Sequence, residues 1–190
     1  VGRVAGKKHC VGGHGHLLGD AGSGYDLATR ALRAVYRDWD RQGRPPSLAA
    51  GMLAHAGAAD LDRLLREVYR PHGKEWVAGF APLVLRAAER GDRLAQAVVA
   101  EATEELVERF AELTRRLRVR RPRVALVGGL FANGFYRRRF QVGVRTRLPG
   151  AQVRLLETPG EIGAARMAGA VEWVSKRVAA EKLVNVEALP

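Results

Sequence analysis

Apolar and polar positions near the start of the chain predict a short β-hairpin followed by a loop. Residues 1–5 and 9–11 are short β-like stretches on either side of Gly6-Lys7-Lys8, and two such stretches around a glycine turn are typical of paired strands. Residues 12–24 are dense in glycine, which predicts an irregular segment. The chain therefore enters its first helix from a glycine-rich loop.

The pattern of the following residues predicts helices. One helix is expected over residues 25–41, with Ser23 able to cap its start and Gly43 ending it. Residues 44–75 predict a loop-rich helical stretch, residues 76–89 a further helix closed by Gly91, and residues 92–117 a long helix capped by Asp92. The apolar stripes behind the first and last of these are Tyr25, Ala28, Leu32, Val35 and Trp39, and Leu94, Val98, Ala102, Leu106, Phe110 and Leu113.

Strands and helices alternate in the last part of the pattern. A buried strand is expected at residues 124–127, a helix at 135–147, a strand at 152–156, and a helix that begins with the capping box at 158–161 and continues through Val174. The whole order predicts an α/β fold with a mixed sheet. We expect one domain over residues 1–174, with a helical insert over about 44–118, and a polar tail over 175–190.

The net charge of +12 comes almost entirely from arginine. Its densest run, residues 115–123, lies where the long helix is expected to end, and cations there complement the helix dipole and solvate the surface. A phosphate-binding face would combine clustered cations with interleaved aromatic or polar base-reading residues. We therefore expect no specific nucleic-acid partner, with a polyanion site as the alternative.

Other bulk features are those of an ordinary globular domain. No apolar run approaches the roughly 20 residues that span a bilayer, so we expect no membrane partner. The single cysteine, Cys10, cannot form an internal disulfide, which fits a reducing cytoplasm. Because the chain begins at once in a predicted strand and without methionine, we expect a missing segment before Val1.

The glycine-rich loop is the first candidate for binding chemistry. Glycines let the backbone approach a ligand closely, and the N-terminus of the following helix offers amides. Asp20 could accept hydrogen bonds from a polyhydroxylated substrate. Alternatively, the loop is a tight turn in which Asp20 and Ser23 are only local caps, and the spacing alone does not separate these interpretations.

Two further patterns carry weaker signals. A strand that ends in Gly128-Gly129 lets a flat ring lie against the backbone, at the strand end where open α/β sheets bind ligands; a packing pair of glycines is the alternative. Four potential zinc ligands lie close together, but their spacing matches no common structural site, so we expect ordinary loop side chains. These four are His9, Cys10, His14 and His16.

Several segments, taken in chain order, carry a family resemblance. These are the loop Gly19-Asp20-Ala21-Gly22-Ser23-Gly24-Tyr25, residues 76–80, the break at Gly91-Asp92, the strand end Val127-Gly128-Gly129, and Pro159 with Ile162-Gly163-Ala164-Ala165. Together they resemble the glycine loop, the adenosine strand and the closing helix of N-acetylglucosamine kinases in the BadF/BadG/BcrA/BcrD ATPase family. The resemblance covers roughly residues 1–172 and implies the ribonuclease H-like fold of actin-type ATPases.

The resemblance also implies two ligand sites and a reaction. The sugar site would be lined by Gly13, His14, Gly15 and Asp20, and the nucleotide site by Ala78, Gly128, Gly129 and Asn133. ATP and Mg²⁺ would be the cofactors of a two-domain cytoplasmic kinase, in which this chain is the C-terminal domain and a homodimer is the candidate assembly. Ala21, His14 and Asp26 replace a Glu and two aromatic residues usual in the family, which leaves the sugar open.

Some parts of a kinase have no counterpart in the sequence. Phosphoryl transfer needs phosphate-cradling loops, a magnesium site and a group that orients the acceptor hydroxyl. In the family these lie in the N-terminal domain and in a Gly-Thr-Gly-Ser segment before the hairpin, and residues 1–190 supply none of them. We therefore expect no catalytic residue here and no activity from the chain alone. The alternatives are a dehydratase-activator ATPase, which the lone cysteine disfavours, and a non-catalytic interaction domain that has kept the fold.

Overall fold

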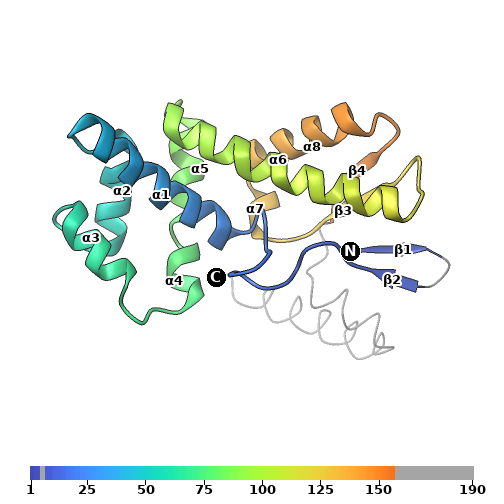
Figure 1. The fold of residues 1–190 in the computed structure, drawn as a ribbon. Helices are drawn as coiled ribbons and strands as arrows, with labels where there is room; N and C mark the ends of the chain where they lie inside the picture. Colours follow the sequence, from blue (N-terminus) through green and yellow to red (C-terminus); the bar gives the residue numbers. More distant parts are fainter. Residues whose placement is uncertain (5–6, 157–190) are drawn as a thin grey trace, which may run out of the picture.

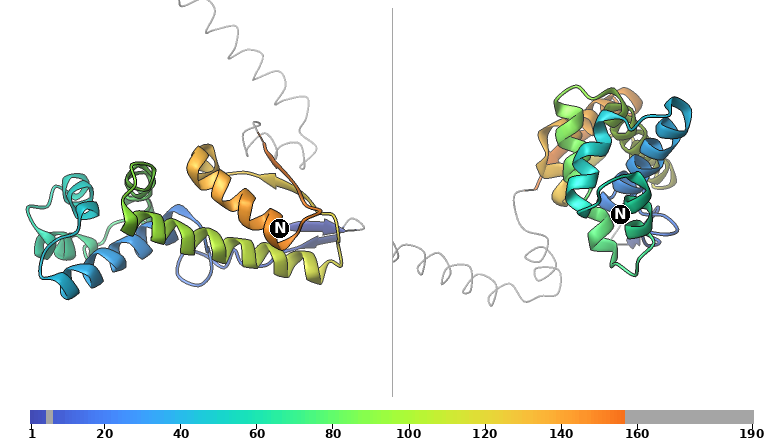
Figure 2. Two further views of the ribbon diagram at one scale, coloured as in Figure 1. Left: turned by 90° about the horizontal axis from the view of Figure 1, so that it is seen from above. Right: turned by 90° about the vertical axis from the view of Figure 1, so that its left-hand side faces the viewer.

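A computed structural model describes residues 1–4 and 7–156 of the chain. The molecule is elongated, with two small sheets at one end and the helices α2 (Ser47–Ala56) and α3 (Leu61–Val68) at the other (Figure 1, Figure 2). The long helix α6 (Arg93–Arg116) connects the two ends (Figure 1). Within the described ranges, no helix has both the length and the apolar character that a membrane span needs.

The limits of α1 (Gly24–Gln42) follow from its flanking residues. The Ser23 Oγ accepts a hydrogen bond from the Asp26 N–H at 3.1 Å and so caps the first turn. Gly43 closes the helix with a φ of 67°, and its N–H donates to the Trp39 carbonyl at 2.8 Å. The predicted helix, its cap and its closing glycine are confirmed.

The segment between α1 and α6 forms four shorter helices. The first two, α2 and α3, lie in the stretch 44–75, which the sequence pattern predicts to be helical and rich in loops. The other two are α4 (Lys74–Ala78) and α5 (Ala81–Glu89). Asp60 caps α3 by accepting the Arg63 N–H at 2.6 Å. The Tyr36 hydroxyl on α1 donates to the Leu61 carbonyl at 2.8 Å and ties this helical layer to α1. The assignment of the layer as an insert within a 1–174 domain stays a prediction.

One continuous helix over residues 76–89 is a wrong prediction. The structure divides this segment at Gly79 and Phe80, and Pro82 lies in the first turn of α5. Proline has no backbone N–H, and in a continuous helix its ring would clash with the carbonyl four residues earlier, that of Ala78. Two helices therefore replace the predicted one.

The helix α6 begins and ends where the sequence predicts. The Asp92 Oδ1 accepts the Ala95 N–H at 2.8 Å at its start, and Arg115 and Arg116 occupy its last turn, where cations complement the dipole. Its buried stripe is broader than predicted because α1, α5 and α8 (Gly134–Arg147) all contact it. The buried residues are Ala95, Val98, Val99, Ala102, Thr103, Val107, Leu113 and Thr114, whereas Leu94, Leu106 and Phe110 are only partly buried.

Two separate pairs of strands take the place of the predicted mixed sheet. The antiparallel hairpin pairs β1 (Gly2–Val4) with β2 (Lys7–His9), and β3 (Arg123–Leu126) pairs in parallel with β4 (Gln152–Leu155). Among the described residues these pairs do not join. A Cβ at Gly2 would lie 2.5 Å from a methyl group of Leu117, so the hairpin packs on the end of α6. The predicted closing helix and the polar tail lie outside the described residues.

The strand β3 is less buried than predicted. Leu126 is buried and Val124 partly so, whereas Arg123 and Ala125 are exposed. This alternation is the pattern of a strand that packs on one face only. The helices α7 (Gly129–Ala132) and α8 connect β3 to β4, and α8 packs against α6.

Among the described residues, the apolar interior consists of one large cluster and one small cluster. The large cluster joins α1, α2, α3, α5, α6 and the start of α8, and its largest fully buried side chains are Tyr136, Phe80, Leu27 and Met52. The small cluster is Val107, Leu126, Phe140 and Val144, from α6, β3 and α8. Both clusters therefore include side chains of α6.

Candidate functional site

The glycine-rich loop, residues 12–23, is closed by its own backbone. The Gly13 N–H donates to the Gly19 carbonyl at 3.0 Å, and the N–H groups of Leu18 and Gly19 both donate to the Gly15 carbonyl, at 3.1 and 2.9 Å. These bonds give residues 13–19 a defined turn. The backbone hydrogen bonds of the loop therefore define its shape.

Asp20 holds this turn through one carboxylate oxygen. Its Oδ1 accepts the Gly15 N–H at 3.2 Å, and its carbonyl accepts the Ser23 N–H at 3.0 Å. The Asp20 side chain does not cap α1, because Ser23 does so. Within the part of the chain that the structure describes, Oδ2 accepts no hydrogen bond, so that oxygen faces no competition for a ligand.

The predicted sugar residues lie close together in this loop. Gly13, His14 and Gly15 are exposed and Asp20 is partly buried. The His14 side chain lies over Gly19, where a Cβ would come within 3.3 Å of the imidazole. The loop therefore has an exposed imidazole and exposed glycine backbone close to the Asp20 carboxylate.

Gly22 anchors the end of the loop to α8. The Tyr136 hydroxyl donates to the Gly22 carbonyl at 2.7 Å, and the Gly22 N–H donates to Asp26 Oδ2 at 2.8 Å. Gly22 is buried with a φ of 73°. A Cβ there would lie 2.9 Å from both the Tyr136 hydroxyl and the Leu106 Cβ, so glycine alone fits without displacement.

A chain of charges ties the start of α1 to α6. Asp26 Oδ1 accepts Arg30 Nε at 2.9 Å, Arg30 also pairs with Glu105, and Glu105 pairs with Arg109 at 3.1 Å. Burial acts to raise the pKa of Glu105, but hydrogen bonds from Arg109 and Arg30 outweigh it and lower that pKa. The loop is therefore attached to the long helix by charged as well as neutral contacts.

Three segments that are far apart in sequence meet at a cleft of about 490 Å³ beside the start of α1. Ala78, Gly129 and Asn133, all predicted to contact nucleotide, line this cleft, and Gly128 directly precedes the lining. The full lining is Gly24, Ala78, Ala81, Pro82, Leu85, Arg86, Gly129, Leu130 and Asn133. Small side chains and backbone form most of the walls, and Arg86 adds a cation.

The wall formed by residues 128–133 is fixed at both ends. Gly128 has a φ of 116°, which side chains strongly disfavour, and it turns β3 into α7. The Asn133 Oδ1 accepts the Tyr136 N–H at 3.0 Å, and its Nδ2 donates to Glu89 Oε1 at 3.0 Å. The Asn133 amide thus caps α8 and holds the turn to α5, so its part in the cleft is to shape the wall.

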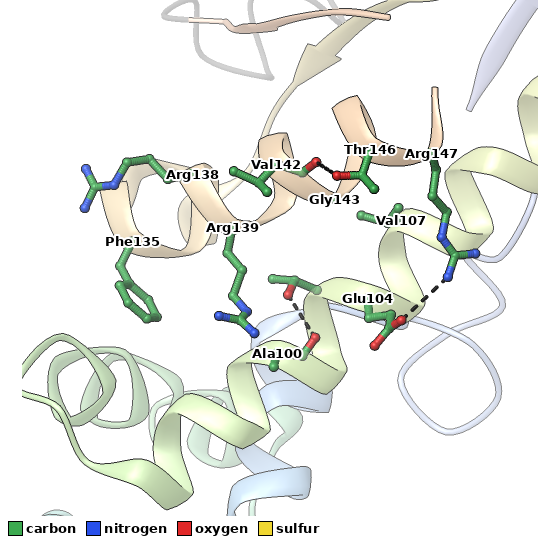
Figure 3. A pocket seen from close by; sticks show the side chains of 11 residues that line it. Ala100, Glu104, Val107, Phe135, Arg138, Arg139, Val142, Gly143, Thr146 and Arg147 are labelled. Carbon is green, nitrogen blue, oxygen red and sulfur yellow. Dashed lines mark hydrogen bonds and ion pairs between the residues drawn. The ribbon is translucent and has the colours of Figure 1, made fainter. Parts of the chain in front are cut away.

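A larger hollow, of about 620 Å³, lies between α6 and α8 (Figure 3). Arg139 extends from α8 toward α6, and Arg147 pairs with Glu104 at 3.6 Å across the gap (Figure 3). None of the predicted site residues lines it. Although this hollow is larger than the cleft, we therefore do not take it as the candidate ligand site.

The side chains considered for zinc are not gathered as ligands. Cys10 is exposed, and the His16 ring makes an edge contact with the Tyr25 ring, with centroids 4.7 Å apart. Over residues 1–4 and 7–156, no three or more His, Cys, Asp or Glu side chains are arranged to hold a metal ion. No described side chains are assigned to zinc or to magnesium.

Comparison with a solved structure gives the class of protein. A crystal structure of a candidate N-acetylglucosamine kinase from Chromobacterium violaceum matches with a TM-score of 0.60 and 31% identity, over 77% of this chain and 48% of that chain. The fold is therefore a mixed α/β fold of the actin-like ATPase class. The chain belongs to the BadF/BadG/BcrA/BcrD ATPase family, whose model matches residues 2–168, and the predicted family is confirmed.

Two curated relatives are sugar kinases. The N-acetylmuramic acid/N-acetylglucosamine kinase of Clostridium acetobutylicum is 29% identical over 125 residues, which cover 64% of this chain and 41% of the relative. The N-acetyl-D-glucosamine kinase of Dictyostelium discoideum is 26% identical over 163 residues, which cover 83% of this chain and 51% of the relative. The chain thus spans about half the length of the curated relatives it matches.

The sequence did not reveal the residues that hold the glycine-rich loop and the cleft wall in place through hydrogen bonds. The sequence patterns did not mark Tyr136 or Glu89, and they marked Asp26 only as a residue that replaces an aromatic one. An aspartate three residues after the capping serine is the sequence signal for a capping partner, and it could have marked Asp26. No local pattern marks Tyr136, because its hydroxyl contacts Gly22, which lies 114 residues away in sequence.

Proposed function

We propose that this chain forms the sugar loop and the adenosine cleft of an ATP-dependent kinase that acts on an amino sugar such as N-acetylglucosamine. Asp20 accepts hydrogen bonds from sugar hydroxyls through the oxygen that the loop leaves free. Gly13, His14 and Gly15 form the adjoining surface. A carboxylate surrounded by bare backbone suits a ligand that carries many hydroxyl donors.

In this proposal the cleft holds the adenosine of ATP, which supplies the transferred phosphoryl group. The ring lies against the Gly129 backbone and Ala78, where short side chains leave room. Gly128 and Asn133 keep the turn in place, and Arg86 offers a planar cation that can stack on an aromatic ring or meet an anion.

One observation carries this proposal. The N-terminus of α1, the end of α4 and the turn after β3 share a single cleft, and α1 is entered directly from the sugar loop. Clefts that join distant segments around backbone and a few polar groups are typical ligand sites. The family and its sugar-kinase relatives point to the same pair of ligands.

The variant Gly129→Leu is expected to weaken ATP binding to the chain at least about tenfold, which is about 1.4 kcal/mol. A Cβ at Gly129 meets no atom within 4 Å, so a side chain can begin there without a clash, and because Gly129 lines the cleft, we expect the leucine to take up space that the nucleotide needs. Titration calorimetry with ATP, alongside thermal unfolding of the same samples, measures the effect.

The control for this experiment is Gly51→Leu. Gly51 is also free of atoms within 4 Å of an added Cβ, but it lies on α2 and does not line the cleft. It should bind ATP as the wild-type chain does. Equal affinity of Gly129→Leu and the wild type would show that nucleotide binds elsewhere, and no ATP binding by the wild-type chain would contradict the cleft assignment.

We expect the 190-residue chain by itself to transfer no phosphoryl group to N-acetylglucosamine. Its sequence has neither of the phosphate segments of the family nor the acid that orients the acceptor. ATP consumption in the presence of the sugar should equal the blank without protein. Turnover in the usual kinase range of about 1–100 per second would contradict this expectation.

The remaining features of the proposal follow from the kinase assignment. Magnesium enters such sites mainly through the phosphates of the nucleotide, so we assign it to the complete kinase and to no residue here. A cytoplasmic location, a partner N-terminal domain and a homodimer belong to the same proposal. A non-catalytic interaction domain would be favoured if neither ATP nor sugar bound the chain.

A further inference from the structure

Tyr136 makes contacts toward both proposed ligand sites. Its ring is fully buried, with 0% of its surface exposed. Its hydroxyl donates to the carbonyl of Gly22 at 2.7 Å, at the end of the sugar loop. Its own N–H donates to Asn133 Oδ1 at 3.0 Å, in the wall of the nucleotide cleft. A single residue therefore joins elements that are otherwise far apart in the chain.

The contact at Gly22 leaves little room for independent movement. Gly22 is buried, and within the described residues its carbonyl accepts a hydrogen bond from Tyr136 alone. A buried carbonyl that loses its donor is unfavourable, so the loop end and the tyrosine should move together. Burial and the nearby Asp26 carboxylate raise the Tyr136 pKa, which keeps the hydroxyl protonated and able to donate.

The contact at Asn133 continues into the cleft. The Asn133 Nδ2 is held by Glu89 of α5, and α5 supplies Ala81, Pro82, Leu85 and Arg86 to the cleft lining. Pressure of a nucleotide on the 129–133 wall would therefore reach Tyr136 through the start of α8. Packed elements with few alternative arrangements can carry such a displacement.

We propose that Tyr136 is a positioning residue that couples occupancy of the nucleotide cleft to the shape of the sugar loop, through its hydrogen bonds to Gly22 and Asn133. The proposal rests on the proposed function, because it takes the cleft as the nucleotide site. ATP in the cleft adjusts the loop that ends at Gly22, and by linkage the sugar adjusts the cleft to the same extent.

The test is an NMR titration of the 190-residue chain with ATP, followed by amide resonances. In the wild type, ATP should shift amides of the cleft, such as Gly129, and amides of the loop, such as Gly15 and Gly19. In Tyr136→Phe the cleft shifts should remain, whereas the loop shifts should fall at least about threefold. Titration with N-acetylglucosamine should show the reverse dependence, with the shift at Gly129 lost in the variant.

Tyr36→Phe is the matched control. The Tyr36 hydroxyl also donates to a backbone carbonyl, that of Leu61 at 2.8 Å, but this bond lies away from both sites. In Tyr36→Phe, the ATP-induced shifts of the loop amides should equal those of the wild type. If the loss of loop shifts in Tyr136→Phe came only from a general loss of stability, Tyr36→Phe should lose them too. Loop shifts retained in Tyr136→Phe would overturn the coupling, as would wild-type titrations in which cleft and loop respond separately.

The outcomes also separate the coupling from the proposed function. If ATP shifts the cleft of the wild type but never the loop, the cleft assignment stands and the coupling is wrong. If ATP shifts no residue of the cleft, the proposed function itself is contradicted. Should Tyr136→Phe fail to fold, the two wild-type titrations still decide, because coupling requires each ligand to shift the site of the other.

Discussion

Replacement of Gly22 by alanine is expected to lower the free energy of unfolding by about 2–5 kcal/mol. Two effects add. The left-handed φ of 73° costs a side chain about 1–2 kcal/mol, and overpacking of a filled interior costs about 1–3 kcal/mol. The new methyl group would lie 2.9 Å from both the Tyr136 hydroxyl and the Leu106 Cβ, and Leu106 belongs to the long helix α6.

Urea unfolding followed by circular dichroism measures this loss, and Gly13→Ala is its control. Gly13 has nearly the same φ, 74°, but a Cβ there meets no atom within 4 Å. Gly13→Ala should therefore lose only the backbone part, about 1–2 kcal/mol. Equal losses at the two positions would mean that the contact between the loop and α8 is looser than the structure has it.

The variant Asp20→Asn should weaken binding of N-acetylglucosamine to the chain at least about tenfold while leaving stability nearly unchanged. A hydrogen bond to a charged group is worth about 1.5–3 kcal/mol. The asparagine keeps an oxygen that can accept the Gly15 N–H, so the turn can still close, but it loses the second carboxylate oxygen. The change therefore separates ligand binding from loop structure.

Sugar affinity from NMR titration and melting temperature should be measured on the same samples. Asp38→Asn is the control, because it removes the same charge from the far end of α1, where Asp38 pairs with Arg41. It should leave sugar binding unchanged. An Asp20→Asn protein that is well folded and binds sugar as the wild type does would show that Asp20 only holds the turn.

Local signals predicted the elements well wherever a capping residue or a breaker stood in sequence. Ser23 and Gly43 set the limits of α1, and Asp92 set the start of α6. The exception was α4 and α5, which were predicted as one helix because apolar residues continue across the break before Pro82. The spacing of apolar residues carries no information about the backbone N–H that a proline lacks.

The arrangement of the elements could not be predicted in the same way. The hairpin was expected to join a mixed sheet, but Gly2 packs against the end of α6, a contact that no periodicity encodes. Three of the residues proposed to contact nucleotide, Ala78, Gly129 and Asn133, line one cleft, and their contact with nucleotide stays a prediction. Tyr136 and Glu89 escaped notice because their roles depend on hydrogen bonds between segments 114 and 44 residues apart.

The turn at residues 128–133 connects the two apolar clusters. Its entry strand is anchored by Leu126 in the small cluster, and its exit helix by Tyr136 in the large one. Within residues 1–4 and 7–156, the buried part of the small cluster has four residues, and we expect transient opening of this part of the chain to begin there, where few contacts must break. A ligand that binds the turn would then also slow amide hydrogen exchange in β3. Nucleotide binding would therefore stabilise a strand that lines no part of the cleft.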